Sequence, residues 1–166
     1  MKKKVIQFIH GMSMGGAETL VKDYCLGIDK TKFDLTLVCL AHYNSPYEKL
    51  LEESEIKIIY IEDFIKPKIF KSKNKIIKLL KRLQIIYYVK KVFKEEKPDI
   101  IHSHLTLNKY IYYSNLPKKV KIVHTVHTEP SIIWNDSIHA RFDKFCLKKI
   151  QKKYITIFIA LHEKIK

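Results

Sequence analysis

Short runs rich in β-branched residues alternate along this chain with longer segments of helical character. The predicted strands lie at 5–10, 33–40, 56–61, 99–102, 121–126 and 156–161. The predicted helices between them lie at 16–28, 45–53, 73–94, 107–114 and 135–152. Several strand runs are almost wholly apolar, which is typical of parallel strands covered on both faces. The alternation predicts a doubly wound α/β fold, with a mainly parallel Rossmann-like sheet and helices on both of its faces.

Length and composition indicate one domain over residues 1–166. A chain of 166 residues with 46% hydrophobic residues can bury one core, and it is short for two. It has only four glycines and five prolines, and no stretch has the composition of a flexible linker. In a doubly wound sheet, ligands bind at the carboxyl ends of the strands, beside the point where the strand order reverses. The residues that follow the predicted strands are therefore the candidates for a site.

Cysteine usage and apolar run lengths indicate a cytoplasmic protein. Cys25, Cys39 and Cys146 lie far apart without a Cys-x-x-Cys pair, which suits reduced thiols. The basic start resembles a secretion signal, but its apolar run stops at once at His10 and Gly11. The longest nearly apolar run, 155–161, is far shorter than the roughly 20 residues that span a bilayer. We expect any membrane contact to be peripheral, at the inner face.

The net charge of +15 is concentrated in one segment, because residues 66–97 hold twelve Lys and Arg side chains against two Glu. Such a field attracts anionic partners, whether nucleic acid, lipid headgroups or a phosphorylated substrate, and charge alone does not choose among them. Within the predicted helix at 73–94, one apolar stripe recurs at helical spacing: Ile76, Leu80, Leu83 and Tyr87. This segment is either an ordinary crossover helix with a solvated basic face or a contact for an anionic membrane.

A glycine loop follows the first predicted strand and leads into a helix. Glycines allow a tight turn and bring backbone N–H groups close to a ligand, and a helix N-terminus favours an anion. The loop is not a Walker A loop, because Ala17 and Glu18 stand where Lys and Ser or Thr are needed. A dinucleotide site is also disfavoured, since Gly-x-Gly-x-x-Gly is absent. Gly15 and Gly16 therefore form either a ligand loop or merely a tight turn.

Two pairs of histidines follow the later strands, and we expect both pairs to point toward one crevice. His102 and His104 are two residues apart, so they share a face of their strand and could chelate a metal. Glu129 is the only close candidate for a third ligand in the sequence, and we predict no metal site. We expect His102 and His124 to be half-buried and bonded to backbone. His104 and His127 are expected further out, where they can bond sugar hydroxyls or phosphate.

Three pieces of this sequence together resemble the N-terminal domain of retaining glycosyltransferase family 4, a large family with the GT-B fold. They are Gly15-Gly16-Ala17-Glu18, Pro98-Asp99-Ile100-Ile101-His102-Ser103-His104 and Val126-His127-Thr128. The resemblance extends over essentially the whole chain, in order and at the predicted strand ends. It implies a two-domain enzyme whose N-terminal half binds the acceptor, while the C-terminal half holds most of the sugar nucleotide.

The resemblance also assigns roles. It implies that His104 is the catalytic residue beside the transferring sugar, and that the glycine loop approaches the donor phosphates and the acceptor. The substrate-binding residues that it implies are Gly15, Gly16, Glu18, His127 and Thr128. The implied reaction moves a hexosyl unit from a sugar nucleotide to a glycan or lipid-linked acceptor, in cell-surface polysaccharide or glycolipid synthesis. Oriented donors rather than a metal cofactor would stabilise the departing diphosphate, and the sequence has no Asp-x-Asp triplet.

One departure from the family pattern concerns the donor half. No Glu in the sequence has a second Glu eight positions on, so the family's Glu-x7-Glu donor motif is missing. The last predicted strand, 156–161, is followed only by the start of a helix. We therefore expect the C-terminal donor-binding domain to be absent and the chain to be inactive alone, as a fragment, a relic or one subunit of a split enzyme with a separate partner chain. The alternative is a non-catalytic anion-binding module for nucleic acid or a membrane surface, although no recognised nucleic-acid motif is present.

Overall fold

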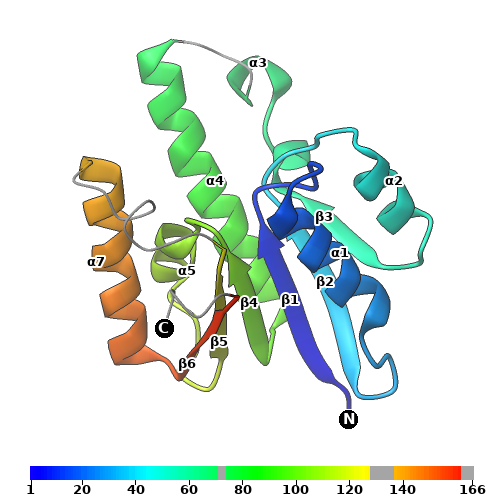
Figure 1. Cartoon of the computed structure of the whole chain (residues 1–166). Helices are drawn as coiled ribbons and strands as arrows, with labels where there is room; N and C mark the ends of the chain where they lie inside the picture. Colours follow the sequence, from blue (N-terminus) through cyan, green and yellow to red (C-terminus); the bar gives the residue numbers. More distant parts are fainter. Residues whose placement is uncertain (71–73, 128–136, 162–166) are drawn as a thin grey trace.

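The computed structural model of this chain describes residues 1–70, 74–127 and 137–161. In these residues a single six-stranded sheet has the order β3-β2-β1-β4-β5-β6, and every neighbouring pair is parallel (Figure 1). The strands are β1 (Lys3–Ile9), β2 (Phe33–Cys39), β3 (Lys57–Tyr60), β4 (Ile100–His104), β5 (Lys121–Val126) and β6 (Thr156–Ala160). The predicted parallel Rossmann-like sheet and all six of its strands are confirmed.

Helices connect the strands as the alternation predicted. They are α1 (Gly16–Gly27), α2 (Pro46–Glu52), α4 (Lys75–Glu96), α5 (Asn108–Ser114) and α7 (Ile138–Lys153). Two short elements were not predicted, the 3-10 turn η1 (Ile61–Phe64) and the single turn α3 (Pro67–Phe70). Elements of one turn are too short to show a helical period in sequence. The predicted start of the last helix, at 135, falls outside the described residues.

Local sequence explains where these helices begin and end. Ser45 caps α2 by accepting from the Glu48 N–H, and Asn74 caps α4 by accepting from the N–H of Ile76. Helix α4 ends at Glu96, and its C-cap residue, Lys97, has a left-handed φ of 49° and precedes Pro98. A proline cannot continue the hydrogen-bond ladder, so the chain leaves the helix there and enters β4.

The core has one cluster on each face of the sheet, because side chains alternate along each strand. On one face, Ile6 and Phe8 of β1 pack in a cluster that includes residues of α4, α5 and α7. On the other face, Ile9 of β1 packs with Val21 and Cys25 of α1 and with residues of α2. Helices therefore cover both faces, as a doubly wound fold requires.

The strand order reverses between β1 and β4, which are neighbours in the sheet although two strands separate them in sequence. The carboxyl ends of β1, β4 and β5 meet at one edge of the sheet, the edge from which α1 begins (Figure 1). This edge is called the carboxyl edge below, and it is the position where such sheets bind ligands. Among the described helices, none is both long and apolar enough to cross a membrane.

Candidate functional site

The loop after β1 is fixed against the end of β2. The N–H groups of Leu40 and Ala41 each donate to the carbonyl of His10 at 3.0 Å. A Cβ on Gly11 would lie 2.5 Å from the ring of Tyr43 and 2.6 Å from the carbonyl oxygen of Ala41. Only glycine fits at this position, since the contact with Ala41 is with backbone that cannot move aside cheaply.

The same loop leaves the N-terminus of α1 open. Gly15 is the N-cap residue and provides no side-chain cap, and Gly16 has open space where a side chain would project. The carboxylate of Glu18 folds back over Gly15, so close that an added Cβ there would collide with it. Thr19 donates to the Gly15 carbonyl at 2.9 Å and steadies the first turn. The positive end of the helix dipole is thus presented at the carboxyl edge.

A chain of side-chain hydrogen bonds runs beneath this edge, across three strands on the α1 face of the sheet. The amide nitrogen of Gln7 lies 3.1 Å from His102 Nδ1, and its carbonyl oxygen lies 2.8 Å from His104 Nε2. His102 Nε2 continues to Thr125 Oγ1 at 2.7 Å, and His104 Nδ1 continues to His127 Nε2 at 2.9 Å. We call these five residues the Gln7–histidine chain. Its members come from β1, β4 and β5, and from the residue after β5.

The Gln7 amide fixes the tautomers of its neighbours. Its NH2 group donates to His102 Nδ1, so His102 carries its proton on Nε2 and donates to Thr125. Its carbonyl accepts from His104 Nε2, so His104 Nδ1 accepts from the Nε2–H of His127. Burial lowers the pKa of His104 to about 2 and the pKa of His102 to about 4, and neighbouring histidines act in the same direction. Both rings are therefore neutral at physiological pH.

His127 is the member of the chain that lies nearer to solvent, and Glu18 connects it with the glycine loop. Burial lowers the pKa of His127. The negative charge of Glu18 acts in the opposite direction, so this carboxylate interacts electrostatically with the His127 ring. Glu18 acts likewise on His10, whose pKa is lowered by burial and by Lys109. Gly15 and Glu18 thus lie together at the start of α1, and His127 follows β5 at the same edge of the sheet. Thr128 lies outside the described residues.

Several expectations about the histidines need correction. His104 is fully buried rather than further out, because β4 lies inside the sheet and both ring nitrogens are engaged by Gln7 and His127. His102 and His124 bond side chains rather than backbone. His124 bonds Ser103 at 2.9 Å and its ring contacts Phe158, whereas His102 lies beside the α1 residue Tyr24. Three of the four rings, His102, His104 and His127, are thus brought together, and only His124 lies on the other face, since neighbouring residues on a strand face opposite ways.

A cationic cleft lies beside the end of β4. Its volume is about 390 Å³, and its lining includes two cations, Arg82 of α4 and Lys109, and one acid, Asp143. The chain reaches it through Leu105, whose φ of 58° is unusual for a bulky residue and marks a sharp turn directly after His104. Sequence reasoning missed Lys109, which nothing distinguishes among so many lysines. It also missed Gln7, although a polar residue inside an apolar strand was a usable signal.

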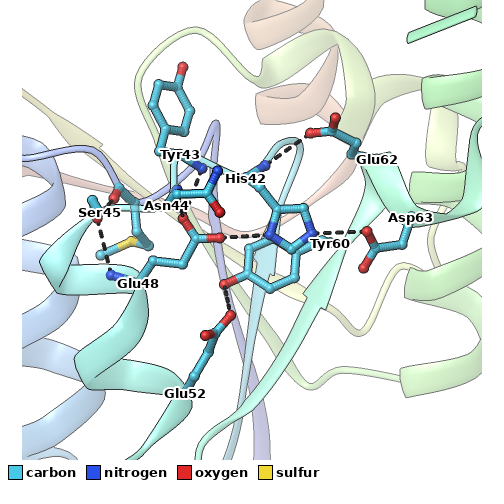
Figure 2. A network of polar contacts seen from close by, with 10 residues as sticks. His42, Tyr43, Asn44, Ser45, Glu48, Glu52, Tyr60, Glu62 and Asp63 are labelled. Carbon is cyan, nitrogen blue, oxygen red and sulfur yellow. Dashed lines mark hydrogen bonds and ion pairs between the residues drawn. The ribbon is translucent and has the colours of Figure 1, made fainter. Parts of the chain in front are cut away.

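A second polar network lies at the end of β2 (Figure 2). His42 Nδ1 is 2.7 Å from Glu48 Oε1, and His42 Nε2 is 2.9 Å from Asp63 Oδ1. The other oxygen of Glu48 accepts from the N–H groups of Tyr43 and Asn44. In the described residues, one ligand atom each of His42, Glu48 and Glu52 lies within 4.8 Å of the others. These atoms are engaged in hydrogen bonds, with Tyr60 donating to Glu52 at 3.0 Å, so the network joins β2, α2, β3 and η1.

This network makes the stability of the fold depend on pH. Partial burial opposes a charge on His42, but bonds to Asp63 and Glu48 raise its pKa. A raised pKa stabilises the fold below the unfolded value of about 6.5, and this stability is lost as pH rises through the folded value. Burial acts to raise the pKa of Glu48, but hydrogen bonds from backbone N–H groups and from His42 lower it. The stability that the ionised Glu48 carboxylate gives to the fold is therefore lost only at acid pH.

We expect His42→Gln to lower the free energy of unfolding by about 1 to 2 kcal/mol at pH 6. The difference from the wild type should shrink steadily toward pH 9, because the wild-type imidazolium then loses its proton. Urea unfolding followed by circular dichroism at several pH values measures this. Gln151→Leu, on the exposed surface of α7, removes no ionisable group and is the control, so its difference from the wild type should not vary with pH. A difference in unfolding free energy that stays constant across the pH range would contradict an ion pair of protonated His42 with Glu48 and Asp63.

Residues 14–164 match a family model described as Glycosyltransferase Family 4, a range that includes Gly15, Glu18, His104 and His127. This chain belongs to glycosyltransferase family 4. The resemblance predicted from three short motifs is confirmed. No curated protein sequence matches this glycosyltransferase family 4 chain significantly.

Solved structures share the fold of this glycosyltransferase family 4 chain. The lipopolysaccharide outer core galactosyltransferase WaaB, in its apo form, aligns with 98% of the chain at a TM-score of 0.62 and 18% identity. A UDP-N-acetylglucosamine 2-epimerase aligns with 99% at 0.58 and 14% identity, and the MurG of Acinetobacter baumannii with 87% at 0.54 and 12% identity. The chain covers 40%, 43% and 39% of these proteins, respectively. These likenesses show the fold alone, a parallel α/β Rossmann-like sheet that GT-B proteins share.

Proposed function

We propose that this family 4 domain is the acceptor-side half of a retaining glycosyltransferase. The enzyme transfers a hexosyl unit from a sugar nucleotide to a glycan or lipid-linked acceptor, in cell-surface polysaccharide or glycolipid synthesis. One observation carries the proposal: the open N-terminus of α1, at Gly15 and Gly16, lies at the same sheet edge as His127 and its buried support. The chain spans about two-fifths of the length of the compared structures.

The charges at the carboxyl edge suit a departing diphosphate without a metal cofactor. Backbone N–H groups of the first turn of α1 and the helix dipole favour an anion there, and a diphosphate would take the place of the Glu18 carboxylate that lies over Gly15. Lys109, whose pKa burial lowers, lines the cationic cleft with Arg82. The backbone donors of α1 are fixed before the reaction, and fixed donors stabilise developing negative charge without reorganisation.

His127 is the imidazole that meets the sugar or the acceptor in this proposal. Because its Nε2–H donates to His104, the neutral ring has Nδ1 as an acceptor, which suits a sugar hydroxyl. We assign His104 a positioning role in place of the direct catalytic role that the resemblance implied. Both of its nitrogens are engaged within the protein, so it positions His127, and contact with the sugar requires exchange of the His127 bond for a substrate bond.

Gly16→Ala tests the glycine loop. The added methyl group has open space, so the free energy of unfolding should change by less than about 1 kcal/mol. The methyl group should obstruct a ligand at the helix N-terminus and raise the dissociation constant for a nucleoside diphosphate or sugar phosphate about tenfold. Titration of ¹⁵N-labelled protein, with shifts read at Gly15, Gly16 and His127, measures this. Gly27→Ala is the matched control, and equal ligand binding by both variants would contradict the ligand loop.

A membrane surface is the second partner that we propose, and α4 supports it. Its stripe of Ile76, Leu80, Leu83 and Tyr87 is exposed, with exposed fractions between 50% and 72%. Basic side chains surround the stripe, and the helix extends beyond the carboxyl edge of the sheet (Figure 1). An apolar stripe flanked by lysines fits the interface of an anionic bilayer, where a lipid-linked acceptor would lie.

Leu80→Ser combined with Leu83→Ser should reduce sedimentation with phosphatidylglycerol vesicles severalfold, since both side chains are exposed and their loss removes apolar contact with the bilayer. Leu26→Ser with Leu50→Ser, also exposed but on α1 and α2, is the matched control. Equal binding to phosphatidylcholine vesicles, or no binding, would contradict membrane docking. Tight, salt-sensitive binding to DNA or RNA in a filter assay would favour the non-catalytic anion-binding module instead.

A further inference from the structure

A large cavity lies away from the proposed transferase site. It has a volume of about 730 Å³ and is bounded by the end of α4, the end of α5 and the turn before β5. Its lining residues Pro98 and Val120 stand two and one positions before β4 and β5 begin. The cavity is therefore at the amino edge of the sheet, opposite the glycine loop. We call it the lysine cavity, after its lining.

Five lysines line this cavity: Lys90, Lys94, Lys97, Lys118 and Lys119. Three of them recur on one stripe of α4 and its cap, and the other two belong to the turn that precedes β5. No acidic side chain is part of the lining. In the described parts of the chain none of the five lysines forms an ion pair.

The nearby acids do not neutralise this charge. Glu96 pairs with Lys57 at 2.7 Å, and Glu95 lies 3.9 Å from Lys91. The carboxyl ends of α4 and α5 contribute about half a negative charge each, which is less than five lysines supply. The cavity therefore has an excess of positive charge, and its walls of low dielectric concentrate the field.

The floor of the cavity is apolar. Phe93, Leu116 and Val120 line it, and these side chains are buried in the core. A cationic rim above an apolar floor matches a molecule with a phosphate group and an apolar portion, because the charges bind the phosphate while the remainder covers the floor. A concave site of this volume suits a small ligand or a single headgroup rather than a nucleic-acid duplex.

We propose that the lysine cavity is a binding site for a phosphate-bearing amphiphile, separate from the transferase site. Lys118 and Lys119 approach the phosphate from the turn, and Lys90, Lys94 and Lys97 approach it from α4. The phosphate comes either from a free phosphorylated molecule or from the headgroup of a phospholipid. The exposed stripe of α4 is apolar from Ile76 to Tyr87, and the α4 lysines of the cavity continue it toward the end of the helix. A bilayer that contacts this helix face could therefore place a lipid headgroup in the cavity.

The test uses the ¹⁵N-labelled whole chain with three probes. Inorganic pyrophosphate represents the free phosphate group, dihexanoyl phosphatidic acid adds the apolar portion, and vesicles of phosphatidylglycerol or phosphatidylcholine represent the membrane. We expect saturable shifts at Leu116 and Val120, with phosphatidic acid bound more tightly than pyrophosphate. Saturation by the soluble probes assigns a free ligand, whereas binding to anionic vesicles alone assigns a headgroup.

Lys118→Gln with Lys119→Gln should weaken the binding of each effective probe about tenfold, without changing the thermal midpoint. The control is Lys30→Gln with Lys66→Gln, which removes the same charge outside the cavity. Equal weakening by both pairs would mean that net charge alone attracts the probes, and would overturn the proposal. The absence of saturable shifts with all three probes would also overturn it. Pyrophosphate can also bind at the carboxyl edge, so shifts at Gly15 and Gly16 report the transferase site and shifts at Leu116 and Val120 report the lysine cavity. Shifts confined to Gly15 and Gly16 would support the transferase site while overturning this one.

Discussion

Gln7→Leu should lower the free energy of unfolding by about 2 to 6 kcal/mol, because it leaves two buried polar groups unpaired at about 1 to 3 kcal/mol each. His102 Nδ1 loses its donor and His104 Nε2–H loses its acceptor, and both rings are almost completely buried. Water cannot easily replace the amide at a position that is itself only 3% exposed. Urea unfolding followed by circular dichroism measures the change.

Gln151→Leu, on the exposed surface of α7, is the control for this substitution and should change stability by less than about 0.5 kcal/mol. A second measurement separates stability from site geometry. Long-range ¹H–¹⁵N spectra of the imidazoles should report a single tautomer for His104 in the wild type and a mixture in Gln7→Leu. A variant as stable as the wild type, with unchanged tautomers, would contradict the role given to the Gln7 amide.

Gly11→Ala should destabilise the fold by about 1 to 3 kcal/mol through overpacking. The new methyl group would meet the Tyr43 ring at 2.5 Å and the Ala41 carbonyl oxygen at 2.6 Å, and the second contact is with backbone at the end of β2. Gly27→Ala is the matched control, since nothing lies within 4 Å of its added methyl group. That variant should be neutral or should stabilise α1 by up to about 1 kcal/mol. Equal stability of the two variants in thermal and urea unfolding would rule out the collision.

The architecture could be predicted because it depends on local patterns. Apolar runs identified all six strands, and the glycines and the residues at strand ends located the carboxyl edge. The pairing of polar side chains could not be predicted, because it depends on which residues face each other across neighbouring strands. Gln7 stands opposite His102 only through the register of β1 and β4. The depth of His104 likewise depends on its neighbours in space, and no property of the motif around it indicates this.

The hydrogen-bond chain through Gln7 has a direction, and a single amide sets it. With its NH2 group toward His102, every donor points from His127 toward Thr125, and His127 has a lone pair at Nδ1. Rotating the amide by half a turn reverses every bond in the chain and leaves His127 with an N–H at the same atom, without any change in net charge. The neutral ring of His127 can thus accept from a sugar hydroxyl in one state and donate to a phosphate oxygen in the other. The orientation of the buried Gln7 amide, two strands away, selects between these states.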